Sequence, residues 1–129
     1  MKYLTLSLLS LLLYCQASHA QVAKRLTGSW TRLDDRKNVI EIFIQRPNGV
    51  FVSNGFDQRG NFIYLEKGKW SVQQDSITFA FDYEASCSKN GDWKVAPPNK
   101  LQPVKFPFTL QADSLLIIQR NVYHRGLGR

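Results

Sequence analysis

The stretch LTGSWTRL, Leu26 to Leu33, places a glycine two residues before a tryptophan in a run where apolar and polar residues alternate. Alternation with a period of two is typical of a β-strand that has one buried face. A second glycine–tryptophan pair occurs in GKWSV, Gly68 to Val72. The first pair opens the part of the chain that we expect to fold, where it could serve binding, catalysis or closure of the fold.

The residues before this stretch have the form of a secretory signal peptide. Lys2 is the basic start, Leu4 to Tyr14 are apolar, and Ser18 and Ala20 are the small residues of a cleavage site. The bulky Tyr14 argues against lipid attachment at Cys15, and the apolar run is shorter than the roughly 20 residues of a membrane span. We therefore expect a signal peptide over residues 1–20, a periplasmic or secreted location, and no membrane span.

The mature chain, residues 21–129, is long enough for one domain with a single core. It carries 16 basic and 10 acidic residues, spread along the chain in a way that favours solubility. Export argues against nucleic acid as a partner. Cys87 is the one cysteine left after cleavage, so no internal disulfide is expected. We expect its thiol to be buried, with a disulfide between two copies as the alternative; the oligomeric state stays open.

Alternating segments separated by turn signals about every ten residues predict eight strands. They are residues 28–33, 39–45, 50–56, 61–66, 69–73, 76–83, 104–110 and 114–120. No stretch has the apolar spacing of a helix. Sequential strands joined by short turns predict an all-β fold, an eight-stranded antiparallel up-and-down β-barrel followed by a short C-terminal tail. Closure into a barrel would remove the exposed sheet edges.

The same alternation predicts which side chains face the barrel interior. The expected inward residues are Ile40, Ile42, Ile44, Ile77, Phe79, Phe81, Tyr83, Val104, Phe106, Phe108 and Leu110. An eight-stranded barrel is either filled by its side chains or holds one small ligand, and both alternatives stay open. The candidate ligand-binding residues are Ile42, Phe79, Phe81, Tyr83, Phe106, Phe108 and Trp93.

One long irregular segment interrupts the strands, over residues 84–101. Gly91, Pro97 and Pro98 disfavour regular structure there, and long loops of compact domains are often functional. Trp93 lies in this loop between two charged residues. It is either an anchor for a protein partner or a lid folded over the barrel mouth.

The order of the motifs L-x-G-x-W, N-G-x-F and G-x-W-x-V resembles lipocalins and the wider calycin group, in particular small lipocalin-like domains of exported bacterial proteins. The resemblance implies that Trp30 closes one end of the barrel. It also implies that a basic residue of the last strand, Arg120, packs across the Trp30 ring. The chain departs from lipocalins in its short length and in lacking the helix after the barrel and the usual disulfide.

No catalytic or metal-binding set is apparent. The mature chain has a single histidine, His124, in its tail, and most carboxylates fall in turns. We therefore expect a non-enzymatic binding protein, without catalytic residues, metal or cofactor, that holds a small apolar or amphipathic ligand in its barrel. The alternative is a module that binds an exported protein, such as an enzyme inhibitor, through the loop 86–100 and the N-terminal arm 21–25.

Overall fold

The computed structural model describes residue 10, residues 20–35 and residues 38–126. Apart from residues 10 and 20, the expected signal peptide lies outside these described residues. Residues 20–26 are helical and lead into the first strand. The strands and the short 3-10 helix η1 are β1 (Gly28–Asp34), β2 (Val39–Gln45), β3 (Val50–Phe56), β4 (Phe62–Gln73), β5 (Ser76–Cys87), β6 (Trp93–Val95), η1 (Pro98–Lys100), β7 (Val104–Gln111), β8 (Leu115–Ile118) and β9 (Asn121–Arg125).

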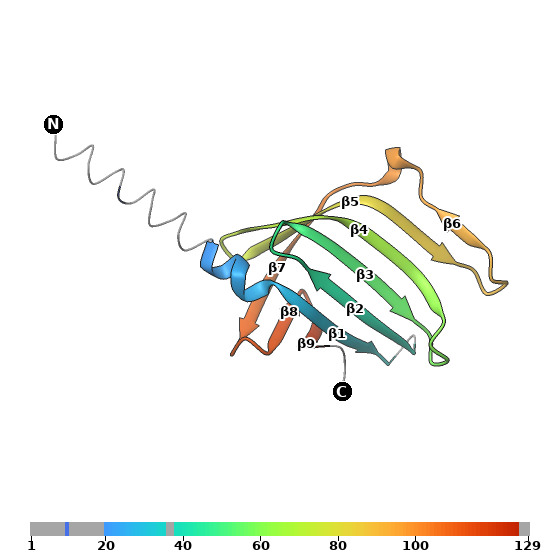
Figure 1. Cartoon of the computed structure of the whole chain (residues 1–129), viewed down its shortest axis with the longest axis horizontal. Helices are drawn as coiled ribbons and strands as arrows, with labels where there is room; N and C mark the ends of the chain where they lie inside the picture. Colours follow the sequence, from blue (N-terminus) through green and yellow to red (C-terminus); the bar gives the residue numbers. More distant parts are fainter. Residues whose placement is uncertain (1–9, 11–19, 36–37, 127–129) are drawn as a thin grey trace.

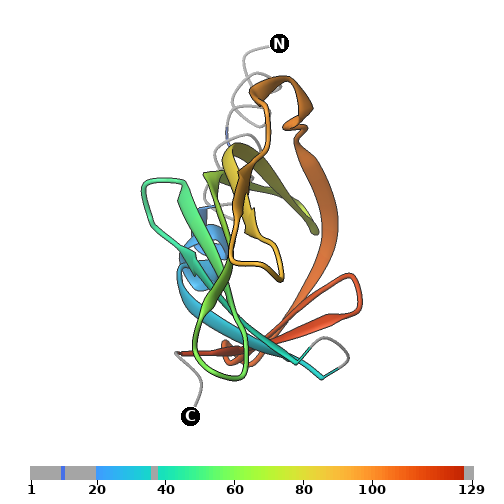
Figure 2. The same ribbon diagram turned by 90° about the vertical axis from the view of Figure 1, so that its right-hand side faces the viewer.

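The strands form a closed antiparallel β-barrel (Figure 1). Eight of them follow one another around the ring in the order β1-β2-β3-β4-β5-β7-β8-β9, and β9 returns to pair with β1. The short strand β6 pairs with the last residues of β5, outside the ring. Seen after a quarter turn, β1 to β4 form one wall and β7 to β9 the other (Figure 2). The predicted eight-stranded antiparallel barrel is confirmed.

The ring reaches eight strands by a route that differs from the prediction. Residues 61–66 and 69–73, expected as two strands, form the single strand β4 apart from residue 61, while residues 121–125 of the expected tail form β9. Gly68, which falls in the gap between these two expected strands, lies inside β4, where a Cβ atom would come within 1.9 Å of the Ala80 carbonyl oxygen. Gly68 therefore allows two backbones to approach closely instead of turning the chain.

A glycine turn also converts part of the expected long loop into regular structure. Gly91 has a positive φ of 85°, and the amide of Ser88 donates to the carbonyl oxygen of Asp92 across the turn. This turn folds β6 back against the end of β5, at Ala85 to Cys87. Cys87 is half-buried there, and not fully buried as expected.

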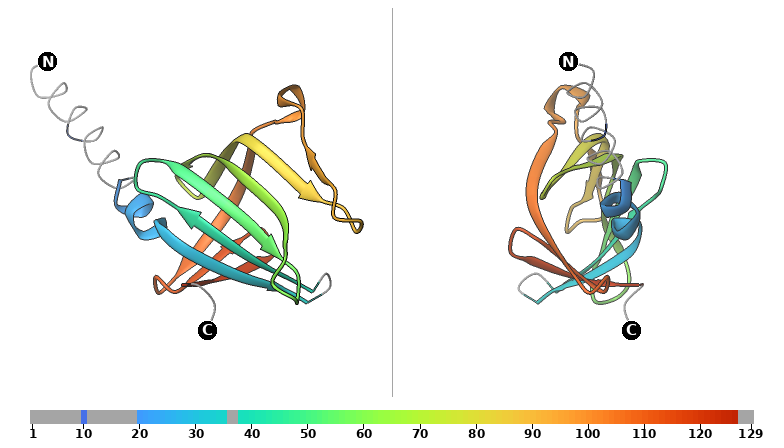
Figure 3. Two further views of the ribbon diagram at one scale, coloured as in Figure 1. Left: turned by 45° about the vertical axis from the view of Figure 1, so that its right-hand side comes forward. Right: turned by 90° about the vertical axis from the view of Figure 1, so that its left-hand side faces the viewer.

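The closed end of the barrel is built around Trp30. Its side chain is fully buried with Leu26, the last residue of the helical segment, and its Nε1 donates to the Leu26 carbonyl oxygen over 2.9 Å. The helical segment, blue in Figure 3, lies beside the start of β1 and covers this end. The expectation that Trp30 closes one end of the barrel agrees with this burial.

The basic residue on the Trp30 ring is Arg125 and not Arg120, so that expectation was wrong. The Arg125 guanidinium lies 4.2 Å from the ring centroid, whereas Arg120 is exposed in the turn before β9. The cause is the extra strand: the strand that closes onto β1 is β9, and its residue opposite Trp30 is Arg125. Gly28 completes the arrangement, because it has a φ of +120° and a Cβ atom there would lie 3.0 Å from the Arg125 Nη1.

The expected inward face of β2 was also wrong. Trp30 and Phe43 are direct partners in the β1–β2 ladder, and paired residues share a face of the sheet. The inward Trp30 therefore turns Glu41, Phe43 and Gln45 into the barrel and places Ile40, Ile42 and Ile44 on the outside. Phe43 and Gln45 are buried, whereas Ile40 is 39% exposed.

A β-bulge corrects the expected face of β5. Lys67 pairs with Tyr83 and Gly68 with Phe81, which leaves Asp82 as an extra residue. One extra residue reverses the alternation of side chains that follow it. Ile77, Phe79 and Phe81 face inward as expected, but Tyr83 turns outward, where Lys67 lies 5.3 Å from its ring centroid. Glu84 faces inward in its place.

Candidate functional site

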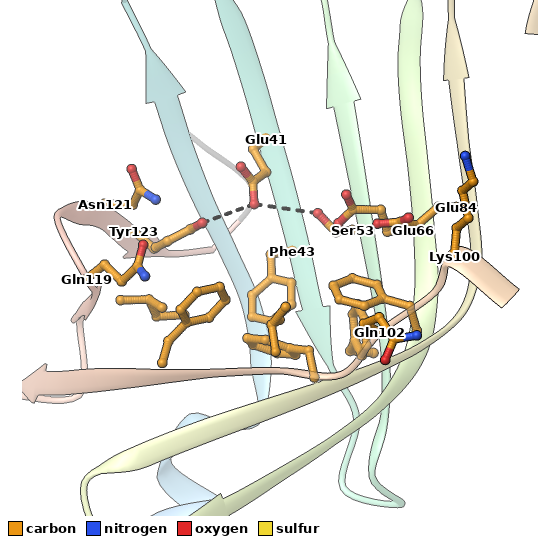
Figure 4. A pocket seen from close by; sticks show the side chains of 16 residues that line it. Glu41, Phe43, Ser53, Glu66, Glu84, Lys100, Gln102, Gln119, Asn121 and Tyr123 are labelled. Atoms are coloured by element: carbon orange, nitrogen blue, oxygen red, sulfur yellow. Dashed lines mark hydrogen bonds between the residues drawn. The ribbon is translucent and has the colours of Figure 1, made fainter. Parts of the chain in front are cut away.

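The barrel contains a cavity of about 450 Å³ at the end away from Trp30 (Figure 4). Its floor is apolar and mainly aromatic. The residues of this phenylalanine floor are Phe43, Phe51, Phe79, Phe81 and Phe106, with Val104 and Ile118 beside them. Above the floor lies a polar rim of Glu41, Ser53, Glu66, Glu84 and Tyr123, faced by Lys100, Gln102, Gln119 and Asn121.

The phenylalanine floor is held by ring contacts between neighbouring strands. Phe79 of β5 contacts Phe43 of β2 and Phe51 of β3 edge to face, with centroid distances of 5.2 and 5.0 Å. Phe51 also meets Phe81 edge to face at 5.5 Å. Edge-to-face pairs are a preferred aromatic arrangement. The floor is therefore held in one packed arrangement, in which Phe43, Phe51 and Phe79 are each less than 7% exposed.

Glu41 is the carboxylate of the rim whose charge is compensated. Arg32 donates from Nη2 to Glu41 Oε2 over 2.8 Å, and the Tyr123 hydroxyl donates to Glu41 Oε1 over 3.1 Å. The Ser53 hydroxyl lies 3.5 Å from the same Oε1 (Figure 4). Burial alone would lower the pKa of Arg32, but the hydrogen bond and charge of Glu41 raise it above its ordinary value.

Glu66 and Glu84 differ from Glu41 because they face each other. They are direct partners in the β4–β5 ladder, and Glu66 is also the partner of Ser53 in the β3–β4 ladder. Among the described residues, neither carboxylate has an ion pair or a hydrogen bond. Burial, with the charges of Glu41 and Glu84 added, raises the pKa of Glu66 from 4.5 to about 7.

Tyr123 at the rim and Tyr64 of β4 stay neutral phenols. Burial, followed by the nearby charge of Glu41, raises the pKa of both Tyr64 and Tyr123 above its ordinary value. Neutral phenols can donate hydrogen bonds to carboxylates or to a ligand. The rim therefore combines hydroxyl donors with carboxylate acceptors above an apolar floor.

Of the candidate ligand-binding residues, the structure brings three together in the cavity: Phe79, Phe81 and Phe106. Phe108 packs against the core without lining the cavity. Ile42 and Tyr83 face the outside of the barrel. Trp93 is 48% exposed on β6 and also lies outside the cavity lining.

Sequence reasoning missed the acidic rim. It attributed most carboxylates to turns and assigned no binding role to Glu41, Glu66 or Glu84, which all lie within strands. Each stands in a segment rich in apolar or aromatic residues, and that placement was the available signal. The face that each one occupies depends on the ladder register and on the bulge at Asp82, neither of which the sequence states.

The class of this protein is assigned from its fold. No protein-family model, curated protein or solved structure matches the chain. The architecture belongs to the class of closed eight-stranded antiparallel β-barrels and is compatible with a lipocalin-like fold. Among the described residues, no helix is long and apolar enough to cross a membrane. The same part of the chain contains no cluster of three histidine, cysteine or acidic residues suited to a metal ion.

Proposed function

We propose that this chain is an exported, lipocalin-like protein of the calycin group that binds a small amphipathic ligand in its barrel and catalyses no reaction. The observation that carries the proposal is the 450 Å³ cavity with its phenylalanine floor and polar rim. Cavities of roughly 300–1,000 Å³ with apolar walls and a few polar groups are typical of small-molecule sites. The form of residues 1–20 supports a periplasmic or secreted location.

A binding role agrees with the groups that line the cavity. They are phenylalanine rings, carboxylates, hydroxyls and side-chain amides. His124, the one histidine of the mature chain, is exposed on β9, and its neighbour Tyr123 is the residue that faces inward. An apolar body would rest on the floor while a polar end meets the rim.

The test is native mass spectrometry of the purified protein together with titration of the uncharged fluorescent probe N-phenyl-1-naphthylamine. We expect saturable binding of one probe per chain, weakened about tenfold by Phe81→Ala because the ring provides part of the floor. Phe62→Ala is the matched control, since Phe62 is 52% exposed and does not line the cavity. Absence of saturable binding and of any bound mass would contradict the proposal.

A second candidate function, binding of an exported protein partner, is supported by an apolar row on the outside of the barrel. Leu33 pairs with Ile40, Ile40 with Phe56, and Phe56 with Phe62, so the row crosses β1 to β4. Leu33 is 61% exposed, and large exposed apolar patches often mark interaction sites.

This candidate is tested by capture from a periplasmic or secreted fraction. Wild type is compared with Leu33→Ser, which tests the apolar row, and with Trp93→Ala, which tests the segment around β6. Loss of one specific partner with either variant supports that surface. Capture that is unchanged by both removes the two surfaces from consideration.

A further inference from the structure

The rim of the cavity carries more negative charge than the protein neutralises. Glu41, Glu66 and Glu84 lie on three strands, β2, β4 and β5, around one opening. Arg32 compensates Glu41 at 2.8 Å. Among the described residues, Glu66 and Glu84 have no ion-pair partner. Two carboxylates are thus left to face the cavity.

The cross-strand pairing of Glu66 with Glu84 is itself unfavourable. Like charges directly opposite in an antiparallel ladder destabilise the sheet. Burial adds to the cost, because a carboxylate loses solvation as it leaves water. Unfavourable charge arrangements in a cavity are candidates for functional sites. A cation placed between the two groups would remove both costs.

We infer that the cavity selects ligands that carry a protonated amine, with the ammonium group between Glu66 and Glu84 and the apolar body on the phenylalanine floor. This inference rests on the proposed function and narrows its ligand class. The ammonium group donates up to three hydrogen bonds, and carboxylates accept them strongly because both partners are charged. The ring faces of the floor also attract cations.

The floor distinguishes this ligand class from a simple metal ion. The described residues contain no set of three acidic, histidine or cysteine side chains close enough for a metal. The carboxylates of the rim are therefore too far apart to coordinate one metal ion together. An anionic amphiphile such as a fatty acid would meet like charge at this rim. Glu66 and Glu84 also line a second hollow beside β6, of about 420 Å³, so the two carboxylates are reached from two sides.

Two lysines of this chain are competing cations. Lys100 lines the cavity and Lys94 lines the adjoining hollow, and both side chains are exposed. Neither forms an ion pair with Glu66 or Glu84 among the described residues. Replacing Lys100 by methionine should therefore strengthen amine binding, because it removes a positive charge that repels the ligand.

The test uses three compounds with one carbon skeleton to displace N-phenyl-1-naphthylamine from the full mature chain at pH 8. They are 4-phenylbutylamine, 4-phenylbutanol and 4-phenylbutyrate, which are cationic, neutral and anionic. We expect the amine to compete about tenfold better than the alcohol. The free energy of one charge-assisted hydrogen bond is sufficient for this ratio of affinities. The anionic 4-phenylbutyrate should compete least well.

Substitutions identify the side chains that cause the preference for the amine over the alcohol. Glu66→Gln and Glu84→Gln should each reduce the amine-to-alcohol ratio, and the double variant should bring it below about threefold while alcohol affinity is retained. Asp82→Asn is the matched control, because it removes one negative charge from β5, the strand that carries Glu84. The Asp82 side chain is exposed and does not line the cavity, so the ratio should stay at its wild-type value.

A pH series adds a readout that general packing would not affect. The titratable and charged groups around Glu66 come from seven elements and are Arg32 (β1), Glu41 (β2), Tyr64 (β4), Glu84 (β5), Lys94 (β6), Lys100 (η1) and Tyr123 (β9). Glu66, with a pKa of about 7, must release its proton to hold an ammonium group. Amine affinity should therefore rise up to about tenfold from pH 6 to pH 8, and alcohol affinity should stay constant.

The outcomes separate this inference from the proposed function. If the probe binds but the amine competes no better than the alcohol, the inference is wrong and the proposed function stands. A selectivity that survives in the Glu66→Gln, Glu84→Gln double variant also overturns the inference, because the carboxylates would not be its source. If no probe binds and native mass spectrometry finds no bound mass, both the inference and the proposed function fail.

Discussion

The two ends of the barrel differ in whether the chain provides partners for their charged side chains. At the closed end, Trp30 is fully buried, its indole N–H is bonded to Leu26, and the charge of Arg125 lies over its ring. At the open end of the barrel, where the cavity lies, Glu66 and Glu84 face each other. No cation is bonded to them among the described residues. The chain itself provides partners for the Trp30 indole and the Arg125 guanidinium, whereas it leaves the charges of Glu66 and Glu84 uncompensated.

This difference assigns different roles to the two ends. Buried polar groups with complete partners stabilise a single structure, whereas uncompensated ones cost stability and are retained where they serve binding. The closed end should therefore dominate the free energy of unfolding. The open end should lower that free energy and respond to ligands and pH.

The largest expected effect comes from Trp30→Ala. Removing a fully buried indole leaves a cavity at the closed end and should lower the free energy of unfolding by about 3–5 kcal/mol. Urea unfolding followed by fluorescence of the remaining tryptophans measures this loss. An unfolding midpoint equal to that of wild type would contradict the role of Trp30 in closing the barrel.

Arg125→Met should have the next largest effect. The substitution removes the cation over Trp30 and the guanidinium bonds to three carbonyl oxygens, of Arg25, Thr27 and Asp113. We expect a loss of about 1–3 kcal/mol in the same assay.

Arg120→Met is the matched control for Arg125, because it removes the same charge from an exposed turn. It should change the free energy of unfolding by less than about 0.5 kcal/mol. Equal effects of the two substitutions would show that Arg125 has no special part in closure.

Apart from the Arg120→Met control, Glu66→Gln should have the smallest effect, and at pH 8 its sign is opposite. The pKa of Glu66 is raised from 4.5 to about 7, so between these values the folded protein keeps a proton that the unfolded chain has lost. The free energy of unfolding therefore falls as pH rises through this window. A neutral glutamine avoids that loss and should stabilise the protein by about 1–2 kcal/mol at pH 8, after allowance for the partial exposure of the side chain.

The pH dependence distinguishes this effect from improved packing. At pH 4 the carboxyl is protonated in both states, so wild type and Glu66→Gln should unfold at the same denaturant concentration. The measurement is the midpoint of urea unfolding at pH 4, 6 and 8. A gain that is equal at all three values would indicate packing and not charge.

The sequence was sufficient to predict the architecture because the ladder and turn signals are local. Period-two alternation and turn residues identify most strands, although the predicted count of eight divided β4 in two and left out β9. The assignments that failed depend on contacts between distant residues. Gly68 is a turn signal in isolation, but in the fold it permits close approach to Ala80.

The candidate site was predictable only in part for the same reason. Phe79, Phe81 and Phe106 lie on strongly alternating strands and line the cavity as expected. The face of β2 could not be read from its own sequence, because three isoleucines favour the face that proves to be outside. Its orientation follows from the pairing of Phe43 with Trp30, and that of Glu84 follows from the bulge.

The pairing of β9 with β1 has a consequence for the order of folding. The ring is joined where Trp30 meets Arg125, two residues 95 positions apart in the chain. A nascent chain that ends before Asn121 would have unpaired edges at β1 and β8, where strands of other molecules could add. Barrel closure must therefore wait for the last strand to be synthesised, and contacts of such long sequence separation favour slow folding.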